Sequence, residues 1–312
     1  MERRLAVVVL AWNAREDVLR CLASLRGETG AGDVVVVVDN ASSDGTAEAV
    51  RAAHPGAQVL ANAENLGYAG GMNVGVRRAL ELGTPWVLLL NQDTEIPPGT
   101  LAALFDAAAR HPGASALQPL LVREDRATID SAGQRLHRVP GATDRLGGRP
   151  LAEAPDADEE VFGPCGAAAL LRAEVFREAG LFDEEFFLIF EDVDLAFRMR
   201  LAGRRTVLVP AVRVVHRRGI SGAAAAPSAL RRFLVARNSV ALALRYWPGA
   251  WLLATAPVIA VRALRALLLR RSAGRSCVPL WRRAWRERRA ARAAARDTGL
   301  DAWFASDRPA LT

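Results

Sequence analysis

Short apolar runs alternate with amphipathic segments through about the first 120 residues of the chain. Each run is short enough for a strand, and the runs occupy residues 5–10, 34–38, 58–60 and 86–90. The segments between them have an apolar helical face or a capping residue at their start, and they occupy residues 15–25, 42–53 and 69–82. Strands that alternate with helices predict parallel βαβ units, so we expect an α/β fold with a mostly parallel central sheet and helices on both faces.

The remainder of the chain has a less regular pattern. Residues 123–160 are rich in Gly, Pro, Asp and Arg and predict a long loop or a small excursion from the sheet. Two helical patterns and then two short strand patterns follow at residues 173–179, 191–202, 206–209 and 212–215. From about residue 226 we expect only helices, so we divide the chain into an α/β body, residues 1–222, and a helical region, residues 223–312.

Composition adds a strong asymmetry of charge. Hydrophobic residues make up 51% of the 312 residues, which is enough to bury a substantial core. The formal charge of +7 is unevenly distributed, because residues 229–296 contain 16 arginines and one glutamate while residues 1–228 carry a net charge of −6. A basic segment of this kind favours phosphate partners, either in nucleic acid or in an anionic membrane.

The cysteines and the first residues of the chain indicate the cellular compartment in which we expect the protein. Cys21, Cys165 and Cys277 are far apart, odd in number and without metal-ligand spacing, which is typical of a reducing compartment. The apolar run after Arg4 is only eight residues long and lacks a small-residue cleavage site, so we interpret it as the first strand and not as a signal peptide. We therefore expect a cytoplasmic location.

The basic segment combines its arginines with four of the seven tryptophans, namely Trp247, Trp251, Trp281 and Trp285. Its longest charge-free stretch, residues 246–261, has 16 residues and two prolines, which is short of the ~20 residues that cross a bilayer. Tryptophan and arginine beside short apolar helices are typical of helices in a membrane interface, which we favour. A helical cap on the body is the alternative, and nucleic acid is disfavoured because no aromatic-basic strand motif or zinc spacing is present.

Polar side chains follow the predicted strands, where parallel sheets bind their ligands. In VDNASSDGT, Asp39 ends the five-valine strand and Asn40 follows it. A carboxylate at this position suits a nucleobase or a ribose, although a turn with a helix cap explains the same residues. The stretch NAENLGYAGGMNVG surrounds a helix start with glycines, which suit either close approach to phosphate or tight helix–strand packing. Its spacing matches neither the P-loop nor the dinucleotide fingerprint.

A second group of residues has the composition of a metal site. In LLLNQDTE, Asn91 and Asp93 directly follow a buried strand. Hard divalent cations take oxygen ligands and need only one or two carboxylates when a diphosphate supplies the rest. A turn is the alternative, but this stretch has acids where glycine is usual. In VRVVHRRGISG, His216 ends a late strand, near where such a site would be completed.

The stretch FFLIFEDVDLAFRMR places three acids, Glu191, Asp192 and Asp194, at the start of a predicted helix. Acids in a first turn stabilise the helix dipole, and Asp194 can pair with Arg198 one turn later. That explanation accounts less well for three acids directly after an apolar run, which directs them toward the interior. Asp192 and Asp194 are two positions apart, so we expect them to have different partners.

Taken in order, these motifs resemble the family 2 glycosyltransferases, which have the GT-A fold, a Rossmann-like α/β architecture. The resemblance covers roughly residues 5–248 and is strongest to the bacterial rhamnosyltransferase-like branch. NQD stands where the family has its Asp-x-Asp metal motif, so Asn91 replaces the first acid. The resemblance implies transfer of a sugar, with inversion, from a dTDP- or UDP-sugar to a hydroxyl. It further implies a glycan or lipid-linked acceptor in cell-wall or surface polysaccharide synthesis, and the branch suggests rhamnose.

The resemblance also implies roles for single residues. Asp192 would be the general base, while Asp93 and His216 would hold Mg²⁺ or Mn²⁺. Glu191 and Asp194 would lie on the acceptor side. The donor-binding residues that it implies are Asn13, Asp39, Asn40, Asn65, Gly67, Asn73, Asn91 and Asp93. The basic helices would hold the enzyme peripherally on the inner face of the bacterial plasma membrane.

Two alternatives from other classes remain open. An inactive nucleotide-fold protein that binds a membrane surface or nucleic acid would share the fold, because fold alone does not confer activity. Convergence of Asp93, Asp192 and His216 in one cleft would distinguish an enzyme from it. A sugar nucleotidyltransferase would require an early glycine-rich loop with a basic residue, and LAWNARED has Arg15 but no glycine.

Overall fold

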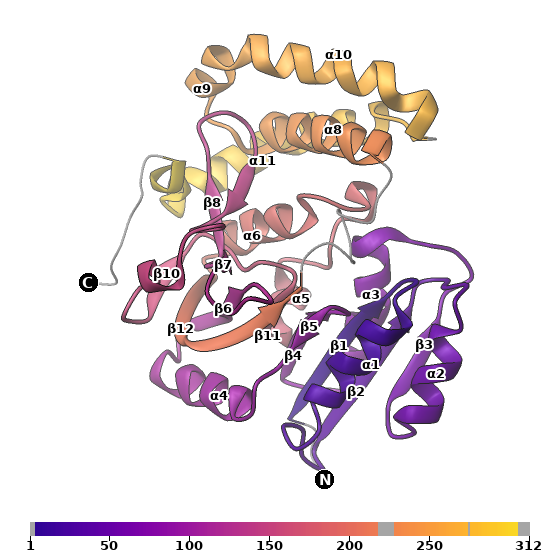
Figure 1. Ribbon diagram of the computed structural model, residues 1–312. Coiled ribbons are helices and arrows are strands. Elements are labelled where there is room, and N and C mark those ends of the chain that lie inside the picture. The colour runs from indigo at the N-terminus through magenta and orange to yellow at the C-terminus, as the bar shows by residue number, and fades with distance from the viewer. Residues whose placement is uncertain (1–3, 218–227, 274, 305–312) are drawn as a thin grey trace.

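The amino-terminal half of the central sheet is parallel, as the alternating pattern predicts. The computed structural model describes residues 4–217, 228–273 and 275–304 (Figure 1). Four of its strands lie side by side in the order β4 (Trp86–Asn91), β1 (Leu5–Ala11), β2 (Asp33–Asp39) and β3 (Gln58–Ala61). Each neighbouring pair is parallel, so the carboxyl ends of these strands meet at one edge of the sheet.

The other half of the sheet is mixed. Beyond β4 its strands follow in the order β11 (Ala168–Arg172), β6 (Ala114–Val122), β12 (Arg205–His216) and β10 (Glu159–Val161). β11 is antiparallel to both β4 and β6, and β10 is antiparallel to β12, whereas β6 and β12 are parallel. Six of these eight strands therefore point the same way, which confirms the expected mostly parallel sheet.

One strand replaces the two that the pattern predicts between residues 206 and 215. β12 is continuous, but its pairing with β6 shifts register between Val209 and Arg213. Pro210 lies at this shift and has no N–H to donate to the ladder. The prediction of two strands is therefore wrong, because the break in the apolar pattern marks an irregularity within one strand.

Helices cover both faces of the sheet, as expected. One face carries α1 (Arg15–Ser24), α2 (Thr46–Ala53) and α4 (Thr100–Arg110), and the other carries α3 (Gly67–Glu81), α5 (Ala173–Glu178) and α6 (Glu191–Leu201). β1 contributes to both cores, because alternate side chains of a strand point to opposite faces. Val7 and Val9 pack in the first core, and Ala6 and Val8 pack in the second.

The glycine- and proline-rich middle segment forms a small excursion with short strands of its own. These strands are β7 (Ile129–Ser131), β8 (Gln134–Leu136) and β9 (Ala142–Asp144), and β10 follows them after the 3-10 helix η1 (Leu151–Glu153). β7 pairs with β6, and β8 pairs with β9 in a separate two-stranded sheet. Strands of three residues are too short for an alternating pattern to identify them in the sequence.

Helices follow β12, and the structure describes them from Ser228 onward. They are α8 (Ser228–Tyr246), α9 (Gly249–Ala254), α10 (Ala256–Ala273), α11 (Val278–Asp297) and the 3-10 helix η3 (Leu300–Phe304). α8 lies against α10 and α11, with α10 at the outer end of the molecule (Figure 1). Tyr246 stacks on Phe197 of α6 with ring centroids 4.2 Å apart, which joins this region to the body. The expected boundary at residue 222 lies outside the described residues, and no described helix is long and apolar enough to span a bilayer.

Candidate active site

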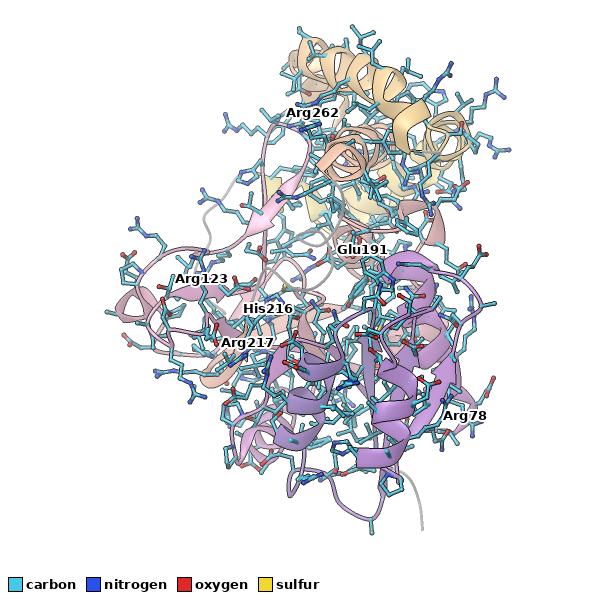
Figure 2. The ribbon with its side chains drawn as sticks, turned by 45° about the vertical axis from the view of Figure 1, so that its right-hand side comes forward. Arg78, Arg123, Glu191, His216, Arg217 and Arg262 are labelled. Atoms are coloured by element: carbon cyan, nitrogen blue, oxygen red, sulfur yellow. The ribbon has the colours of Figure 1, made fainter. Side chains whose placement is uncertain are left out.

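A short antiparallel pairing brings the two predicted metal ligands together. β5 (Thr94–Glu95) follows β4 after a turn and pairs with the end of β12, with Thr94 opposite His216. The backbone N–H of Arg217 donates to the carbonyl of Asp93 at 3.0 Å and extends this pairing. As a result, Nε2 of His216, which Figure 2 labels, lies 3.4 Å from Oδ1 of Asp93, and both side chains are buried.

His216 has a second carboxylate on the other side of its ring. Its Nδ1 lies 2.8 Å from Oδ2 of Asp130, a buried residue of β7. Burial lowers the pKa of His216, but the hydrogen bonds and charges of Asp130 and Asp93 outweigh it and raise this pKa to about 9. No sequence motif marks Asp130, because an aspartate in a segment rich in glycine and proline is usually part of a turn.

The pair of Asp93 and His216 fits a divalent cation whose other ligands come from outside the chain. Adjacent ligands of an octahedral ion lie about 3 Å apart when each is ~2.1 Å from the metal. The 3.4 Å between these two side chains is close to that separation. Over residues 4–217, 228–273 and 275–304, no group of three or more His, Cys, Asp or Glu side chains could hold a metal by itself. Water and diphosphate oxygens would supply the remaining ligands.

Asp39 and Asn13 lie at the ends of adjacent strands. Asp39 ends β2 opposite Ala11 of β1, is only 4% exposed, and its Oδ1 has no hydrogen-bond partner among the described residues. A buried carboxylate oxygen without a partner is costly, so this atom is available to a ligand N–H or hydroxyl. Asn13 has a positive φ of 46° and accepts a hydrogen bond from the N–H of Ser43, which shapes the loop after β2.

Asn40 and Asn65 use their side chains to hold the loop before α3. Nδ2 of Asn40 donates at 3.0 Å to Oδ1 of Asn65 and to the carbonyl of Gly67. Oδ1 of Asn40 accepts from the N–H of Leu66, and Oδ1 of Asn65 accepts from the N–H of Gly67 at 2.8 Å. These groups are satisfied within the chain, so the geometry favours loop positioning over direct donor binding for Asn40, Asn65 and Gly67.

Gly75 and Asn73 of α3 pack against the chain's own residues. A Cβ atom at Gly75 would lie 2.2 Å from a methyl carbon of Val8, so only glycine allows this helix to approach β1 so closely. Asn73 of the same helix is buried, donates to the carbonyl of Phe182 and accepts from its N–H, both at 2.9 Å. Asn73 therefore anchors the chain that leads toward α6, and its predicted contact with the donor has no support in this geometry.

Glu191, which Figure 2 labels, and Asp192 begin α6, and burial removes both carboxyl groups from water. Oδ2 of Asp192 accepts from the N–H of Gly166 at 3.1 Å, and Gln134 of β8 also hydrogen-bonds this carboxylate. Burial raises the pKa of Asp192 to about 6, against the lowering effect of the Gly166 N–H. Burial and the charge of Asp192 raise the pKa of Glu191 well above its usual value. Asp192 therefore has the properties of a proton acceptor near neutral pH.

The segment that leads into β11 connects the two parts of the site. The N–H of Gly166 donates to Asp192, and the carbonyl of the next residue accepts from the N–H of Asn91 at 2.9 Å. Burial raises the pKa of the Cys165 thiol, and nearby carboxylates that include Asp192 and Asp130 raise it further. The predicted base therefore contacts Gly166, and the strand end that precedes Asp93 by two residues contacts Ala167.

The loop before α6 is strained, and α8 holds it. Three of its non-glycine residues have φ values between +65° and +71°, namely Phe187, Ile189 and Phe190. Such a backbone costs on the order of 1–3 kcal/mol for each residue and is common at functional sites. Nδ2 of Asn238 on α8 donates to three carbonyls of this loop at 2.7–3.1 Å. A side chain of the helical region, which the sequence analysis did not single out, therefore helps to place Asp192.

Asp194 is fully buried among the protein's own donors. Its carboxylate accepts from Arg198 at 2.8 Å, from Arg245 at 2.6 Å and from the Tyr246 hydroxyl at 2.8 Å. It has no exposed surface, and both of its oxygens are engaged. The arrangement does not support the predicted acceptor-side role and instead assigns Asp194 to packing between α6 and α8.

Comparisons with known proteins place the chain in a family. The family model described as Glycosyl transferase family 2 matches residues 6–180. An N-acetylglucosaminyl-diphospho-decaprenol L-rhamnosyltransferase of Mycobacterium tuberculosis is 32% identical over 236 residues, which are 70% of this chain and 77% of that protein. A low-salt glycan biosynthesis hexosyltransferase of Haloferax volcanii is 25% identical over 200 residues, which are 63% of this chain and 61% of that protein.

Solved glycosyltransferase structures share the fold. A mannosyltransferase from Pyrobaculum calidifontis, in complex with GDP-Man and Mn²⁺, has a TM-score of 0.55 and 20% identity, covering 96% of this chain and 88% of its own. GalNAc-T7, with UDP, GalNAc and Mn²⁺, has a TM-score of 0.59 and 17% identity, covering 80% of this chain and 49% of its own. The expected GT-A fold with a helical extension is therefore confirmed. The chain belongs to the family 2 glycosyltransferases, in their rhamnosyltransferase-like branch, and it is a glycosyltransferase.

Proposed function

We propose that this enzyme transfers a sugar with inversion of configuration, in a metal-dependent reaction, and that Asp192 is its general base. The observation that carries the proposal is the position of Asp192, with a pKa of about 6, beside the segment that also contacts Asn91. Such a carboxylate is ionised at neutral pH and can accept the proton of an attacking hydroxyl. A single displacement needs only one carboxylate opposite the leaving group, so no covalent nucleophile is required.

On the donor side, we propose that Asp93 and His216 hold Mg²⁺ or Mn²⁺ and that Asp39 contacts the nucleobase. A bound cation would neutralise the charge that develops on the departing diphosphate. The short distance between Asp93 and His216 supports the first assignment, and the partnerless Oδ1 of Asp39 supports the second. The donor would be a dTDP- or UDP-sugar, and the loop held by Asn13 would border its nucleoside.

On the acceptor side, we propose a sugar that is linked to a lipid through diphosphate. The Mycobacterium relative is named for transfer of L-rhamnose to N-acetylglucosaminyl-diphospho-decaprenol, and it supports both this acceptor class and rhamnose as the sugar. Glu191 would contact the acceptor, since its buried Oε2 has no partner among the described residues. The reaction would then contribute to cell-wall or surface polysaccharide synthesis at the cytoplasmic face of the plasma membrane.

Two surfaces of the helical region support attachment to an anionic membrane. Large apolar side chains of α9 and α10 are 58–79% exposed, and they are Leu253, Val261, Leu264 and Leu268. Exposed apolar groups of this kind, beside basic residues, are typical of membrane-binding faces. The neighbouring helices α8 and α11, together with α9, cover the body through the core that contains Tyr246. A packed cap and a membrane surface are therefore compatible descriptions of this region.

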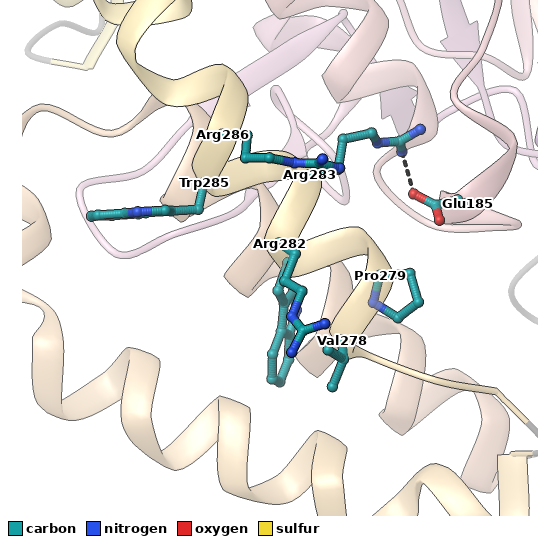
Figure 3. A pocket seen from close by; sticks show the side chains of 8 residues that line it. Glu185, Val278, Pro279, Arg282, Arg283, Trp285 and Arg286 are labelled. Carbon is teal, nitrogen blue, oxygen red and sulfur yellow. Dashed lines mark ion pairs between the residues drawn. The ribbon is translucent and has the colours of Figure 1, made fainter.

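A groove with a volume of 730 Å³ runs along α11 (Figure 3). Its lining includes Arg282, Arg283 and Arg286 together with Trp281 and Trp285. Arg283 is neutralised by acids of the body, whereas Arg282 and Arg286 form no ion pair with another residue that the structure describes. Arginine beside tryptophan suits the phosphates of lipid headgroups, which adds a basic contact to the apolar face of α10.

The catalytic proposal is tested by a transfer assay with UDP- and dTDP-sugars and a soluble diphosphate-linked N-acetylglucosamine acceptor. Turnover should require Mg²⁺ or Mn²⁺ and should disappear when EDTA is added. The product should have the anomeric configuration opposite to that of the donor, as measured by NMR. A product with retained configuration would exclude the single displacement, and unchanged turnover in EDTA would exclude the metal.

Membrane attachment is tested by sedimentation with vesicles that contain phosphatidylglycerol. Arg282→Glu combined with Arg286→Glu should release the protein from the vesicles. The matched control changes Arg51 and Arg110, which are 50% and 53% exposed on the body, to glutamate and alters the net charge equally. Equal release by both double variants would show a general charge effect, and no release by either would remove α11 from the proposal.

A further inference from the structure

We infer that Asp130 is a positioning residue that holds the ring of His216 so that its Nε2 lone pair faces the metal position beside Asp93. The inference rests on the proposed metal dependence, because it concerns one of the two protein ligands. It adds to the donor site a residue of the middle excursion that none of the sequence motifs includes. Its basis is the geometry around the two ring nitrogens.

Each nitrogen of the His216 ring faces a different carboxylate. Nδ1 lies 2.8 Å from Oδ2 of Asp130, and Nε2 lies 3.4 Å from Oδ1 of Asp93. An ionised carboxylate accepts hydrogen bonds but donates none, so the contact with Asp130 requires the proton on Nδ1. A bound cation would displace the proton from Nε2, which would leave a neutral ring with its proton on Nδ1 and Nε2 as the ligand. His216 and Asp130 are 7% and 1% exposed, so solvent has little access to this contact.

Three neighbouring strands place Asp130 beside His216. Val122 of β6 pairs with Val215 of β12 on one side and with Ile129 of β7 on the other. Asp130 and His216 each follow the paired residue of their own strand, so they come from the two strands that flank the end of β6. On the other side of this carboxylate, Nε of Arg123 lies 3.9 Å from Oδ1 of Asp130; Figure 2 labels Arg123 and His216.

The chain contains a matched control for this contact. Nε2 of His111 lies 2.8 Å from Oδ2 of Asp158, the same distance as in the pair of His216 and Asp130. His111 follows α4 and has no predicted role in the site. Removal of Asp158 therefore tests the general effect of losing an aspartate–histidine contact, whereas removal of Asp130 tests the effect on the metal ligand.

The experiment measures Mn²⁺ affinity by electron paramagnetic resonance with saturating UDP, and again with dTDP. Asp130→Leu should weaken Mn²⁺ binding roughly 10- to 100-fold, which is the usual effect of losing such a partner. Asp130→Asn should remain within a few-fold of the wild type, because its amide oxygen can accept the same hydrogen bond. Asp158→Leu should bind Mn²⁺ as the wild type does, and His216→Ala should bind it weakly.

Nitrogen NMR of protein labelled with ¹⁵N-histidine gives a second readout, since the chain has only four histidines. In the wild-type complex with Mg²⁺ and UDP, the proton of His216 should be on Nδ1. A proton on Nε2 in that complex would overturn the inference even if Asp130→Leu failed to fold. If Asp130→Leu binds Mn²⁺ as tightly as the wild type while His216→Ala binds it weakly, the role of Asp130 is wrong and the metal proposal stands. A wild-type protein that binds no Mn²⁺ with either nucleotide would overturn the metal proposal as well.

Discussion

The guanidinium of Arg245 lies 2.6 Å from the carboxylate of Asp194, and this buried ion pair joins α8 to α6. The same arginine contacts Asp183 of the body and Glu287 of α11, so three acids share its charge. Asp192 lies two positions before Asp194, on the same helix. The helical region therefore supports the framework of the proposed active site in addition to any role at a membrane surface.

Replacement of Arg245 by methionine should destabilise the whole protein. The variant leaves the buried Asp194 without the closer of its two arginines, and breaking a buried ion pair in this way costs about 3–5 kcal/mol. The free energy of unfolding, measured in urea, should fall by that amount. Arg51→Met is the control, because its pair with Glu48 is exposed and contributes less than about 1 kcal/mol. Equal losses in the two variants would contradict the structural role of Arg245.

Asp192→Asn should abolish transfer and leave the donor site intact. Asparagine keeps the shape of aspartate and can still accept from the N–H of Gly166, but it cannot take a proton from the acceptor. Turnover should therefore fall by roughly 10²- to 10⁴-fold, the usual contribution of a general base. Calorimetry should show unchanged affinity for UDP with Mn²⁺. Near-normal turnover would remove Asp192 from the mechanism.

The pH dependence of the reaction should report the ionisation of Asp192. Burial raises its pKa to about 6, and the base acts only when deprotonated. The value of kcat/KM should therefore be constant above this pH and decrease about tenfold per pH unit well below it. Circular dichroism over the same range would exclude unfolding as the cause. A flat profile between pH 5 and pH 8 would be inconsistent with this assignment.

Asp39→Ala should weaken binding of the donor nucleotide. The buried Oδ1 of Asp39 has no partner among the described residues, so its hydrogen bond to a nucleobase would form only in the complex. Loss of a hydrogen bond to a charged group should reduce the affinity for UDP or dTDP roughly 10- to 100-fold. The melting temperature of the nucleotide-free protein should not fall, because Oδ1 of Asp39 makes no hydrogen bond with the described residues in that state. Unchanged nucleotide affinity would show that the nucleobase does not contact Asp39.

Gly75→Ala should destabilise the packing of α3 on the sheet. The added methyl group would lie 2.2 Å from a methyl carbon of Val8, and overpacking of this kind costs about 1–3 kcal/mol. Gly56→Ala is the control, because among the described residues only its own chain neighbours lie within 4 Å of its added carbon. Thermal unfolding should distinguish the two variants. If Gly75→Ala is as stable as the control, α3 does not lie as close to β1 as the structure indicates.

The alternating pattern alone determined most of the fold and the edge of the sheet where the site lies. Periods of two and of 3.6 residues are local properties, so strands such as β1 and β4 can be identified from the sequence. Parallel strands align their carboxyl ends, and this rule brings Asp39 and Asp93 to one edge without any knowledge of side-chain contacts. The family motifs added His216 and Asp192, because their order along the chain is also visible in the sequence.

The partners of these residues were decided only by the tertiary structure. Asp130 reaches His216 through strands of three residues, and Asn238 reaches the loop before α6 from a helix about fifty positions later in the chain. Asp194 resembles Asp192 in the sequence but meets Arg245 and Tyr246, so burial separates their roles. Contacts between distant segments depend on how whole helices and strands pack. A local pattern of polar and apolar positions does not indicate which distant side chain will contact a given residue.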